Sequence, residues 1–265
     1  MLAEILRGNR GLRPLVHCIT NYVTANDCAN LLLACGASPI MADDPEEAEE
    51  ITAGCASLVL NLGTPNPRKL EAMRLAGREA NRLHHPVVFD PVGAGASAFR
   101  RDAARQLLDE VRFSVIRGNV SEIEALVRFG EAHPGVDADV LDADIAAAVK
   151  LSRMSGAAVA MTGSTDIVTD GRTVYRVLNG HPMMRSVTGA GCMLSALTGA
   201  FAAASPEDPL TAALAAVCAM GVCGERAHAR LRDGDGNAAF RNYIIDAMYD
   251  LDPEGLEREA RYEVL

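Results

Sequence analysis

The chain alternates short runs rich in β-branched residues with longer stretches of helical pattern, and this alternation limits its fold more than any other feature. Parallel strands that are buried on both faces are near-continuous apolar runs, and each needs a crossover helix to reach the next. The apolar runs cover residues 14–19, 56–62, 85–90, 113–119 and 157–163. We therefore expect an α/β fold in which helices cover both faces of a mostly parallel sheet.

Polar residues placed just before the helical stretches are typical N-caps, and Pro favours the first helical turn. Three capped helices are expected, with Asn21 capping a helix that runs to 34, Asn66 one that runs to 83 and Ser97 one that runs to 111. Gly36 and Gly54 lie where two helices should end.

The pattern changes after residue 163. Two strand-like runs between residues 164 and 179 flank Asp170-Gly171, which predicts a β-hairpin at an edge of the sheet. Helical stretches follow near 189–204, 208–230 and 236–250, and then a charged tail at 252–264. No linker or repeat interrupts the 265 residues, so we expect a single domain over 1–265.

Composition excludes several classes of protein. A net charge of −10 and a pI near 5.1 argue against a nucleic-acid binder or a protein that binds anionic membranes. Seven cysteines without a CxxC pair indicate reduced, mostly buried thiols rather than disulfides or a zinc site. The apolar stretches 189–205 and 210–224 fall short of the ~20 residues that span a bilayer. Without a signal peptide, a cytoplasmic protein is expected.

A glycine-rich turn stands directly before the apolar stretch 189–204. The segment Thr188-Gly189-Ala190-Gly191 can turn tightly and present free N–H groups at a helix N-terminus, where hydrogen bonds and the helix dipole attract an anion. It predicts a cradle for phosphate oxygens, although a turn that lets helices pack closely has the same pattern.

Cys192 follows in the first turn of that helix. The positive potential there lowers a thiol pKa, so Cys192 could accept the proton of a substrate hydroxyl. A buried, inert thiol is the alternative interpretation.

A third group comes from the ends of neighbouring predicted strands. Asn119 and Glu122 fit a capping box, and they also fit a site in which Glu122 holds Mg²⁺ through water while Arg117 meets phosphates. Asp90, at the end of another strand, would supply a second carboxylate, although Asp before Pro is also common in turns.

Several adjoining motifs in one order make the chain resemble the hydroxyethylthiazole kinases of the ribokinase-like superfamily. The motifs are the stretch from Pro14 to Glu50, LVLNLGT at 58–64, VVFDPVGAGAS at 87–97, IRGNVSEI at 116–123, MTGSTDIVTDG at 161–171 and TGAGC at 188–192. Together they cover nearly the whole chain.

The resemblance implies an enzyme that transfers a phosphoryl group from ATP, with Mg²⁺, to 4-methyl-5-(2-hydroxyethyl)thiazole for thiamin salvage. It also implies a homotrimer whose active sites lie between subunits. Carried over residue by residue, it places the thiazole against Asn21, Val23, Met41, Gly63, Thr188 and Gly189, ATP against Arg117 and Thr162, and Mg²⁺ near Asp90 and Glu122. Most of the superfamily has Asp where this chain has Cys192.

Three other functions share some of these features. A hydroxymethylpyrimidine kinase and an ATP-dependent dehydratase of hydrated nicotinamide cofactors have the same kind of sheet and phosphate loop, and a regulatory nucleotide-binding protein would need no acceptor. The segment from Asn21 to Met41 favours the thiazole kinase because it suits a small neutral heterocycle.

Overall fold

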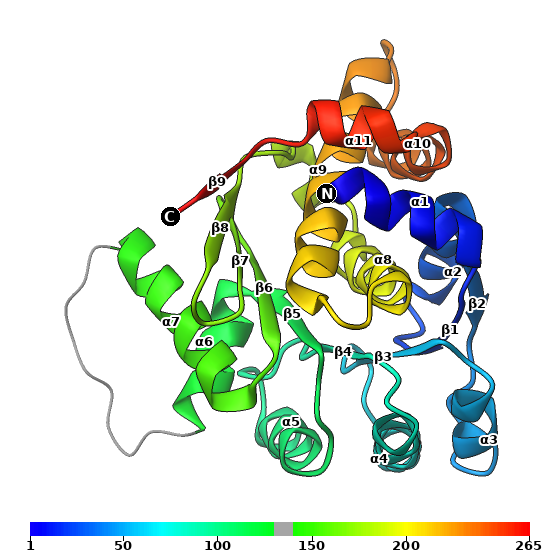
Figure 1. The fold of residues 1–265 in the computed structure, drawn as a ribbon, viewed down its shortest axis with the longest axis vertical. Helices are drawn as coiled ribbons and strands as arrows, with labels where there is room; N and C mark the ends of the chain where they lie inside the picture. Colours follow the sequence, from blue (N-terminus) through cyan, green and yellow to red (C-terminus); the bar gives the residue numbers. More distant parts are fainter. Residues whose placement is uncertain (130–139) are drawn as a thin grey trace.

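The computed structural model describes residues 1–129 and 140–265 (Figure 1). Within them nine strands form one sheet in the order β2-β1-β3-β4-β5-β6-β7-β8-β9. The pairs from β2 through β6 are parallel, and the last three pairs are antiparallel. The mostly parallel sheet expected from the sequence is confirmed.

Apart from the short edge strand β2, the strands as far as β7 are apolar and largely buried. They are β1 (Leu15–Ile19), β2 (Ser38–Ile40), β3 (Ser57–Asn61), β4 (Val87–Asp90), β5 (Val115–Asn119), β6 (Ala158–Thr162), β7 (Asp166–Thr169), β8 (Val174–Val177) and β9 (Tyr262–Val264).

The helices form two layers. They are α1 (Leu2–Leu12), α2 (Ala25–Cys35), α3 (Ala48–Ala53), α4 (Pro67–Arg82), α5 (Ala98–Glu110), α6 (Val120–Arg128), α7 (Val140–Ser155), α8 (Ala190–Ala204), α9 (Pro209–Arg230), α10 (Asn237–Asp250) and α11 (Pro253–Glu259), with a 3₁₀ turn at Pro182–Ser186.

Alternate residues of the inner strands enter two separate cores. In β3, Val59 belongs to the core that α1, α2, α8, α9 and α10 line on one face, whereas Leu58 and Leu60 belong to the core that includes α4 and α5 on the other (Figure 1). This alternation is why the strands are apolar throughout and why both faces must be covered.

Local signals were mostly interpreted correctly. Asn66 and Ser97 cap α4 and α5 by accepting the N–H of Lys69 and Arg100, and Gly36 ends α2 in a left-handed conformation with φ 96°. The predicted hairpin forms as β7 and β8. Gly54 also ends a helix, α3, but with an ordinary φ of −84°.

One predicted cap is wrong. The N-cap of α2 is Thr24 rather than Asn21, and α2 begins at Ala25. The Oδ1 of Asn21 instead accepts the N–H of Val23 and of Thr24, both at 3.1 Å, and forms a turn before the helix. The oxygen of this amide thus faces the start of the helix, while its Nδ2 is left to donate to Asn61 and Cys192.

The tail holds regular structure that the sequence interpretation missed. Asp252 caps the short helix α11, and β9 pairs with β8 at the edge of the sheet. The pairing joins residues almost ninety positions apart, so no local sequence pattern predicts it.

Helix α9 is long and apolar enough to cross a membrane by length and composition alone. However, 83% of its most apolar window is buried inside the protein. Its contacts run to α8 and α10 and to the strands from β5 to β8. The length argument made from the sequence is therefore wrong, because α9 extends beyond residues 210–224, but in the described residues it is a core helix.

Candidate active site

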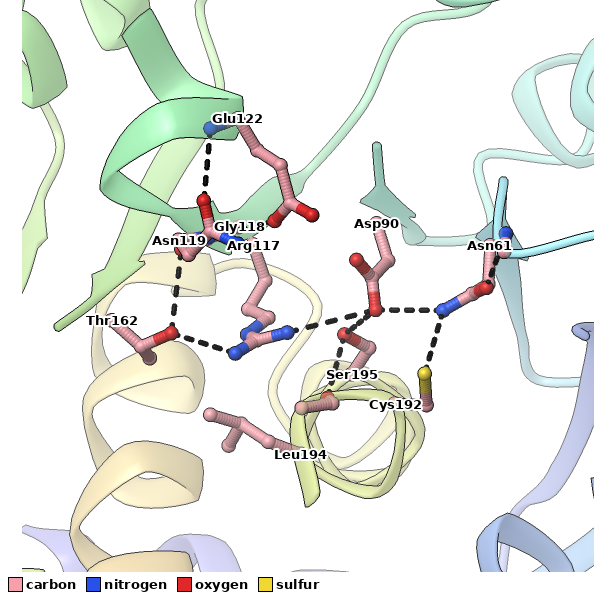
Figure 2. A network of polar contacts seen from close by, with 12 residues as sticks. Asn61, Asp90, Arg117, Gly118, Asn119, Glu122, Thr162, Cys192, Leu194 and Ser195 are labelled. Atoms are coloured by element: carbon pink, nitrogen blue, oxygen red, sulfur yellow. Dashed lines mark hydrogen bonds and ion pairs between the residues drawn. The ribbon is translucent and has the colours of Figure 1, made fainter. Parts of the chain in front are cut away.

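The sheet order fixes where a site can form. The chain leaves β1 toward β2 on one side and later returns as β3 on the other, so the loops at the carboxyl ends of β1 and β3 diverge. Ligands of open α/β sheets bind at such a switch point. The N-terminus of α8 lies at the same edge of the sheet, beside the end of β4 (Figure 2).

A continuous line of polar contacts crosses this edge (Figure 2). Arg117 Nη2 donates to Thr162 Oγ1 at 2.6 Å, and Arg117 Nη1 lies 3.7 Å from Asp90 Oδ2. Asn61 Nδ2 donates to the same Asp90 oxygen at 2.7 Å and lies 3.3 Å from the Sγ of Cys192. Four strand ends and α8 are thereby joined through side chains.

Cys192 accepts from two amides. Asn21 Nδ2 lies 3.1 Å from its Sγ, and the Oδ1 of Asn61 in turn accepts from Asn21 at 3.0 Å. Amide N–H groups aimed at sulfur stabilise a thiol acting as acceptor or a thiolate.

The pKa of Cys192 does not follow the sequence expectation. Burial raises it above its ordinary value and the Asp90 carboxylate raises it further, whereas hydrogen bonds from Thr24, Asn61 and Asn21 lower it only in part. The expectation of a lowered thiol pKa is therefore wrong, because the position in the first helical turn did not reveal the desolvation or the neighbouring carboxylate.

Asp90 is completely buried. Its Oδ2 also accepts from Ser195 Oγ at 2.7 Å, while its Oδ1 has no hydrogen-bond partner among the described residues. Burial raises the pKa of Asp90 to about 6, against the opposing charge of Arg117. A buried carboxylate oxygen without a donor costs stability and marks a position prepared for a ligand.

Glu122 is more fully engaged. Its Oε1 accepts the N–H of Gly93 at 2.9 Å, and its Oε2 accepts the N–H of Asn119 at 2.8 Å. The side chain of Asn119 accepts the N–H of Glu122, so the predicted capping box is confirmed. Glu122 thus fastens the loop after β4 to the start of α6, and each carboxylate oxygen keeps one lone pair for water.

Three glycines allow this crowding. A Cβ on Gly191 would lie 2.3 Å from Arg117 Nη1, one on Gly189 2.3 Å from Thr24 Cγ2, and one on Gly63 2.6 Å from Asn21 Cβ. Gly189 also has φ 86°, which disfavours other residues. The guanidinium of Arg117 therefore packs directly against the glycine-rich turn.

The backbone donors of that turn are free to meet a ligand. Gly189 is the N-cap of α8, and the N–H groups of Gly191 and Cys192 lie in the first turn, where no intrahelical acceptor exists. In the described residues, the N–H of Ala190 donates to the carbonyl oxygen of Val187 at 3.4 Å. The turn has the geometry of an anion cradle.

The structure gathers most of the sequence-predicted residues around this cluster. Asn21 and Gly63 touch Cys192 or one another, and Val23 and Thr188 lie on the surface of their loops. Met41 stands apart from the hydrogen bonds of the cluster in the described residues: it follows β2 and is 38% exposed. Ala190 lies at the start of α8.

The sequence analysis missed two residues of the cluster, Asn61 and Ser195. Asn61 is the register partner of Asp90 at the end of the adjacent strand, so aligning the two apolar runs by their last polar residues would have found it. Ser195 follows Cys192 by nearly one helical turn, but it lies inside an apolar helix and looked like an ordinary core residue.

Comparison with known proteins gives a family match over nearly the whole chain. A model of the hydroxyethylthiazole kinase family matches residues 6–254. A hydroxyethylthiazole kinase of Clostridium acetobutylicum is 54% identical over 271 residues, which cover 99% of each chain. The structure of a hydroxyethylthiazole kinase from Pyrococcus horikoshii OT3 is 36% identical, with a TM-score of 0.90 over 100% of this chain and 98% of the other.

A more distant structure supports the fold alone. A ribokinase-like superfamily protein of Enterococcus faecalis is 12% identical, and it superposes with a TM-score of 0.64 over 94% of either chain. Its likeness reaches the sheet and its helical layers, as expected for a superfamily that shares a ribokinase-like fold. At this identity it carries nothing about the substrate. The match over residues 6–254 and the full-length relatives show that the chain belongs to the hydroxyethylthiazole kinase family.

Proposed function

We propose that this protein transfers the γ-phosphoryl group of ATP to the hydroxyl of 4-methyl-5-(2-hydroxyethyl)thiazole and forms the thiazole phosphate used in thiamin salvage. The observation that carries the proposal is the polar line from Thr162 to Cys192, which ends at the glycine-rich turn of α8 in a chain of this family.

The acceptor belongs on the side of β1, β2 and β3. Asn21, Met41 and Gly63 stand on the loops that follow these strands, and Val23 is exposed beside them. The thiazole would lie among them with its hydroxyl toward Cys192 and Gly189, and Thr188 would stand at the entrance. Val23, Met41 and Gly63 would give the ring an apolar lining and Asn21 one polar contact, which suits a small neutral ring.

ATP belongs on the side of β5 and β6. Arg117 and Thr162 stand at the ends of these strands, and the Nε of Arg117 is buried without a partner in the described part of the chain. The free N–H groups of Gly191 and Cys192 would hold phosphate oxygens, and the guanidinium beneath them would neutralise charge that spreads over the transferred group.

Asp90 and Glu122 fit a magnesium site. Oδ1 of Asp90 is a buried oxygen without a donor, and Glu122 can accept from a metal-bound water. The residues that the structure describes hold no group of three or more metal-ligating side chains. Mg²⁺ commonly binds one or two carboxylates together with waters and substrate phosphates. When bound, Mg²⁺ would neutralise phosphate charge and orient the phosphates.

Cys192 would take the proton of the acceptor hydroxyl. Its raised pKa makes the thiolate scarce at neutral pH, so we assign it a modest part in the rate. Phosphoryl transfer through a loose transition state lets the proton leave late, and positioning by the loops and charge neutralisation by Arg117 matter more.

A homotrimer with active sites between subunits belongs to the proposal. Tyr22 and Val23, next to the acceptor loops, are 67% and 65% exposed in the single chain. A neighbouring subunit would cover these apolar side chains and close the acceptor pocket from outside. We also propose that the enzyme works in the cytoplasm, where ATP is available.

The test is ADP release by the purified protein with Mg²⁺ and ATP, compared between the hydroxyethylthiazole, the hydroxymethylpyrimidine and no acceptor. We expect turnover that depends on the thiazole. Preferential turnover of the pyrimidine would make it a sister kinase, and ADP formation that no acceptor changes would contradict the proposal.

A further inference from the structure

A buried lysine lies beside the acceptor loops. The side chain of Lys69 is 1% exposed, although it sits in the first turn of α4. Lysine is almost never fully buried unless its charge is paired, because the ammonium loses its hydration. Its environment therefore has to supply a partner for each of its three N–H donors.

Each donor of Lys69 meets a different loop. Nζ lies 2.9 Å from the carbonyl oxygen of Thr20, which follows β1, and 3.3 Å from Oδ2 of Asp43, which follows β2. It lies 3.5 Å from Oγ1 of Thr64, which follows β3. These three loops carry Asn21, Met41 and Gly63, the residues to which we assign the acceptor.

An aromatic ring completes the enclosure. The Nζ of Lys69 stands 3.7 Å from the centroid of the Tyr22 ring, within the range of a cation–π contact. Tyr22 precedes Val23 in the β1 loop, and its N–H also donates to Thr64 Oγ1 at 3.4 Å. The loops after β1 and β3 are thus tied to each other as well as to Lys69.

The position of the charge is unfavourable for α4 by itself. The N-terminal end of a helix carries a partial positive charge, so a cation in its first turn opposes the helix dipole. The N–H of Lys69 is already satisfied by the cap residue Asn66. The ammonium therefore does not stabilise α4, whereas it is a common hydrogen-bond donor for the three loops.

We propose that Lys69 is a positioning residue for the acceptor: its ammonium sets the spacing of the loops after β1, β2 and β3 and so shapes the thiazole pocket. The inference rests on the proposed function and deepens it. Lys69 acts through Thr20, Asp43 and Thr64, and it touches neither the cluster around Cys192 nor the nucleotide side.

The experiment compares Lys69→Met with the wild type in steady-state assays in which thiazole and ATP are varied separately. Methionine keeps most of the side-chain volume and removes the three donors. We expect the KM for the thiazole to rise about tenfold or more, because loop misplacement on the scale of an ångström is costly. The KM for ATP should stay within about twofold, because Arg117 and Thr162 lie in β5 and β6, away from these three loops.

Arg68→Met is the matched control. Arg68 precedes Lys69 on the same helical turn and pairs with Asp44 at 2.7 Å, but both side chains are exposed. Exposed pairs contribute little, so both KM values should change by less than about twofold.

Three results would overturn the inference and leave the proposed function standing. Unchanged thiazole kinetics in Lys69→Met would do so, and an equal rise of both KM values would assign Lys69 to the whole fold. If Lys69→Met does not fold, Asp43→Asn replaces it, because this variant leaves the ammonium in place and removes one of its partners. It should raise the KM for the thiazole and leave the KM for ATP unchanged. An unchanged KM for the thiazole in Asp43→Asn is the third result that would overturn the inference. A wild type without thiazole-dependent turnover would overturn the proposed function first and this inference with it.

Discussion

At the scale of single residues, the proposed chemistry depends on how Asn21 and Asn61 hold Cys192. Both amides donate to Sγ, so the sulfur is held as an acceptor whatever its ionisation. The desolvation that raises its pKa keeps the thiolate, the form that can take a proton, scarce at neutral pH. Cys192 would therefore take the proton of the hydroxyl only from this minor form, which limits its contribution to the rate.

Replacing Cys192 tests this role. Cys192→Ser should lower kcat by about tenfold, less than the ~10²-fold or more that a full general base supplies. Cys192→Asp should stay active, because a carboxylate can accept both amide donors. The measurement is single-turnover product formation, in which chemistry limits the rate. Full activity of the serine variant would remove the proton-acceptor role.

Asp90 gives a prediction with a definite sign. Burial raises its pKa from 3.8 to about 6, so its neutral form favours the folded state below about pH 4, and this contribution is lost as the pH rises through about 6. Asp90→Asn should therefore raise the free energy of unfolding above pH 6, by on the order of 2–3 kcal/mol, and change it little near pH 4. Its turnover should fall at least ~10²-fold, because the proposed magnesium carboxylate is gone.

Denaturant unfolding at pH 4 and pH 8, with turnover measured at the higher pH, checks both statements. If the asparagine variant lost stability at pH 8 relative to pH 4, the assignment of Asp90 as a strained, ligand-facing carboxylate would be wrong.

At the scale of elements, the glycine-rich turn and α8 act as one unit with β5. Gly191 is the contact between them, since its missing side chain is where Arg117 lies. The arginine is buried and held by Thr162 and Asp90, so it has little freedom to yield. A larger residue at 191 must therefore displace either the turn or the guanidinium.

Gly191→Ala should reduce kcat/KM for ATP by about tenfold or more, because it moves the charge that meets the phosphates. The matched control is Gly11→Ala in α1, where no neighbour lies within 4 Å of an added Cβ, and its kinetics should equal those of the wild type. Wild-type kinetics in Gly191→Ala would show that the position of the Arg117 guanidinium does not depend on the glycine-rich turn.

The sequence predicted elements well where local signals exist and poorly where long-range contacts decide. The apolar runs, the caps at Asn66 and Ser97 and the hairpin around Asp170 follow from patterns a few residues long. Strand β9 forms because β8 offers it an open edge, and neither its charged neighbours nor its length reveals that pairing.

The site shows the same division. Strand ends predicted the meeting of Asp90, Arg117 and Thr162, because parallel strands end at one edge. Asn61 and Ser195 were not predicted because each belongs to the site only through its hydrogen bond to Oδ2 of Asp90, which depends on how the chain packs. Burial also decided the pKa of Cys192, and burial is a property of the packed chain.

At the scale of the whole molecule, the two proposed binding regions lie on either side of β4. The loops proposed for the acceptor follow β1 to β3, and the residues proposed for the nucleotide lie in β5 and β6, with Asp90 on β4 between them. The N-terminus of α8 lies beside the end of β4 (Figure 2). In this proposal one sheet edge brings the phosphoryl donor and the hydroxyl together.

The proposed trimer is a prediction at this scale. Light scattering of the purified protein should give a mass three times that of the 28.0 kDa chain at the concentrations used for activity. The reason is the apolar surface at Tyr22 and Val23 beside the acceptor loops. A fully active monomer would show that one chain builds the whole pocket.

The central claim is that this cluster moves the γ-phosphoryl group of ATP onto the thiazole alcohol. The most direct measurement uses ATP labelled with ¹⁸O in its γ-phosphoryl group and detects the product by mass spectrometry. The account predicts thiazole phosphate that carries the label, and it predicts that Arg117→Ala forms it far more slowly. Labelled inorganic phosphate in place of the ester, or an ester formed equally well by Arg117→Ala, would contradict it.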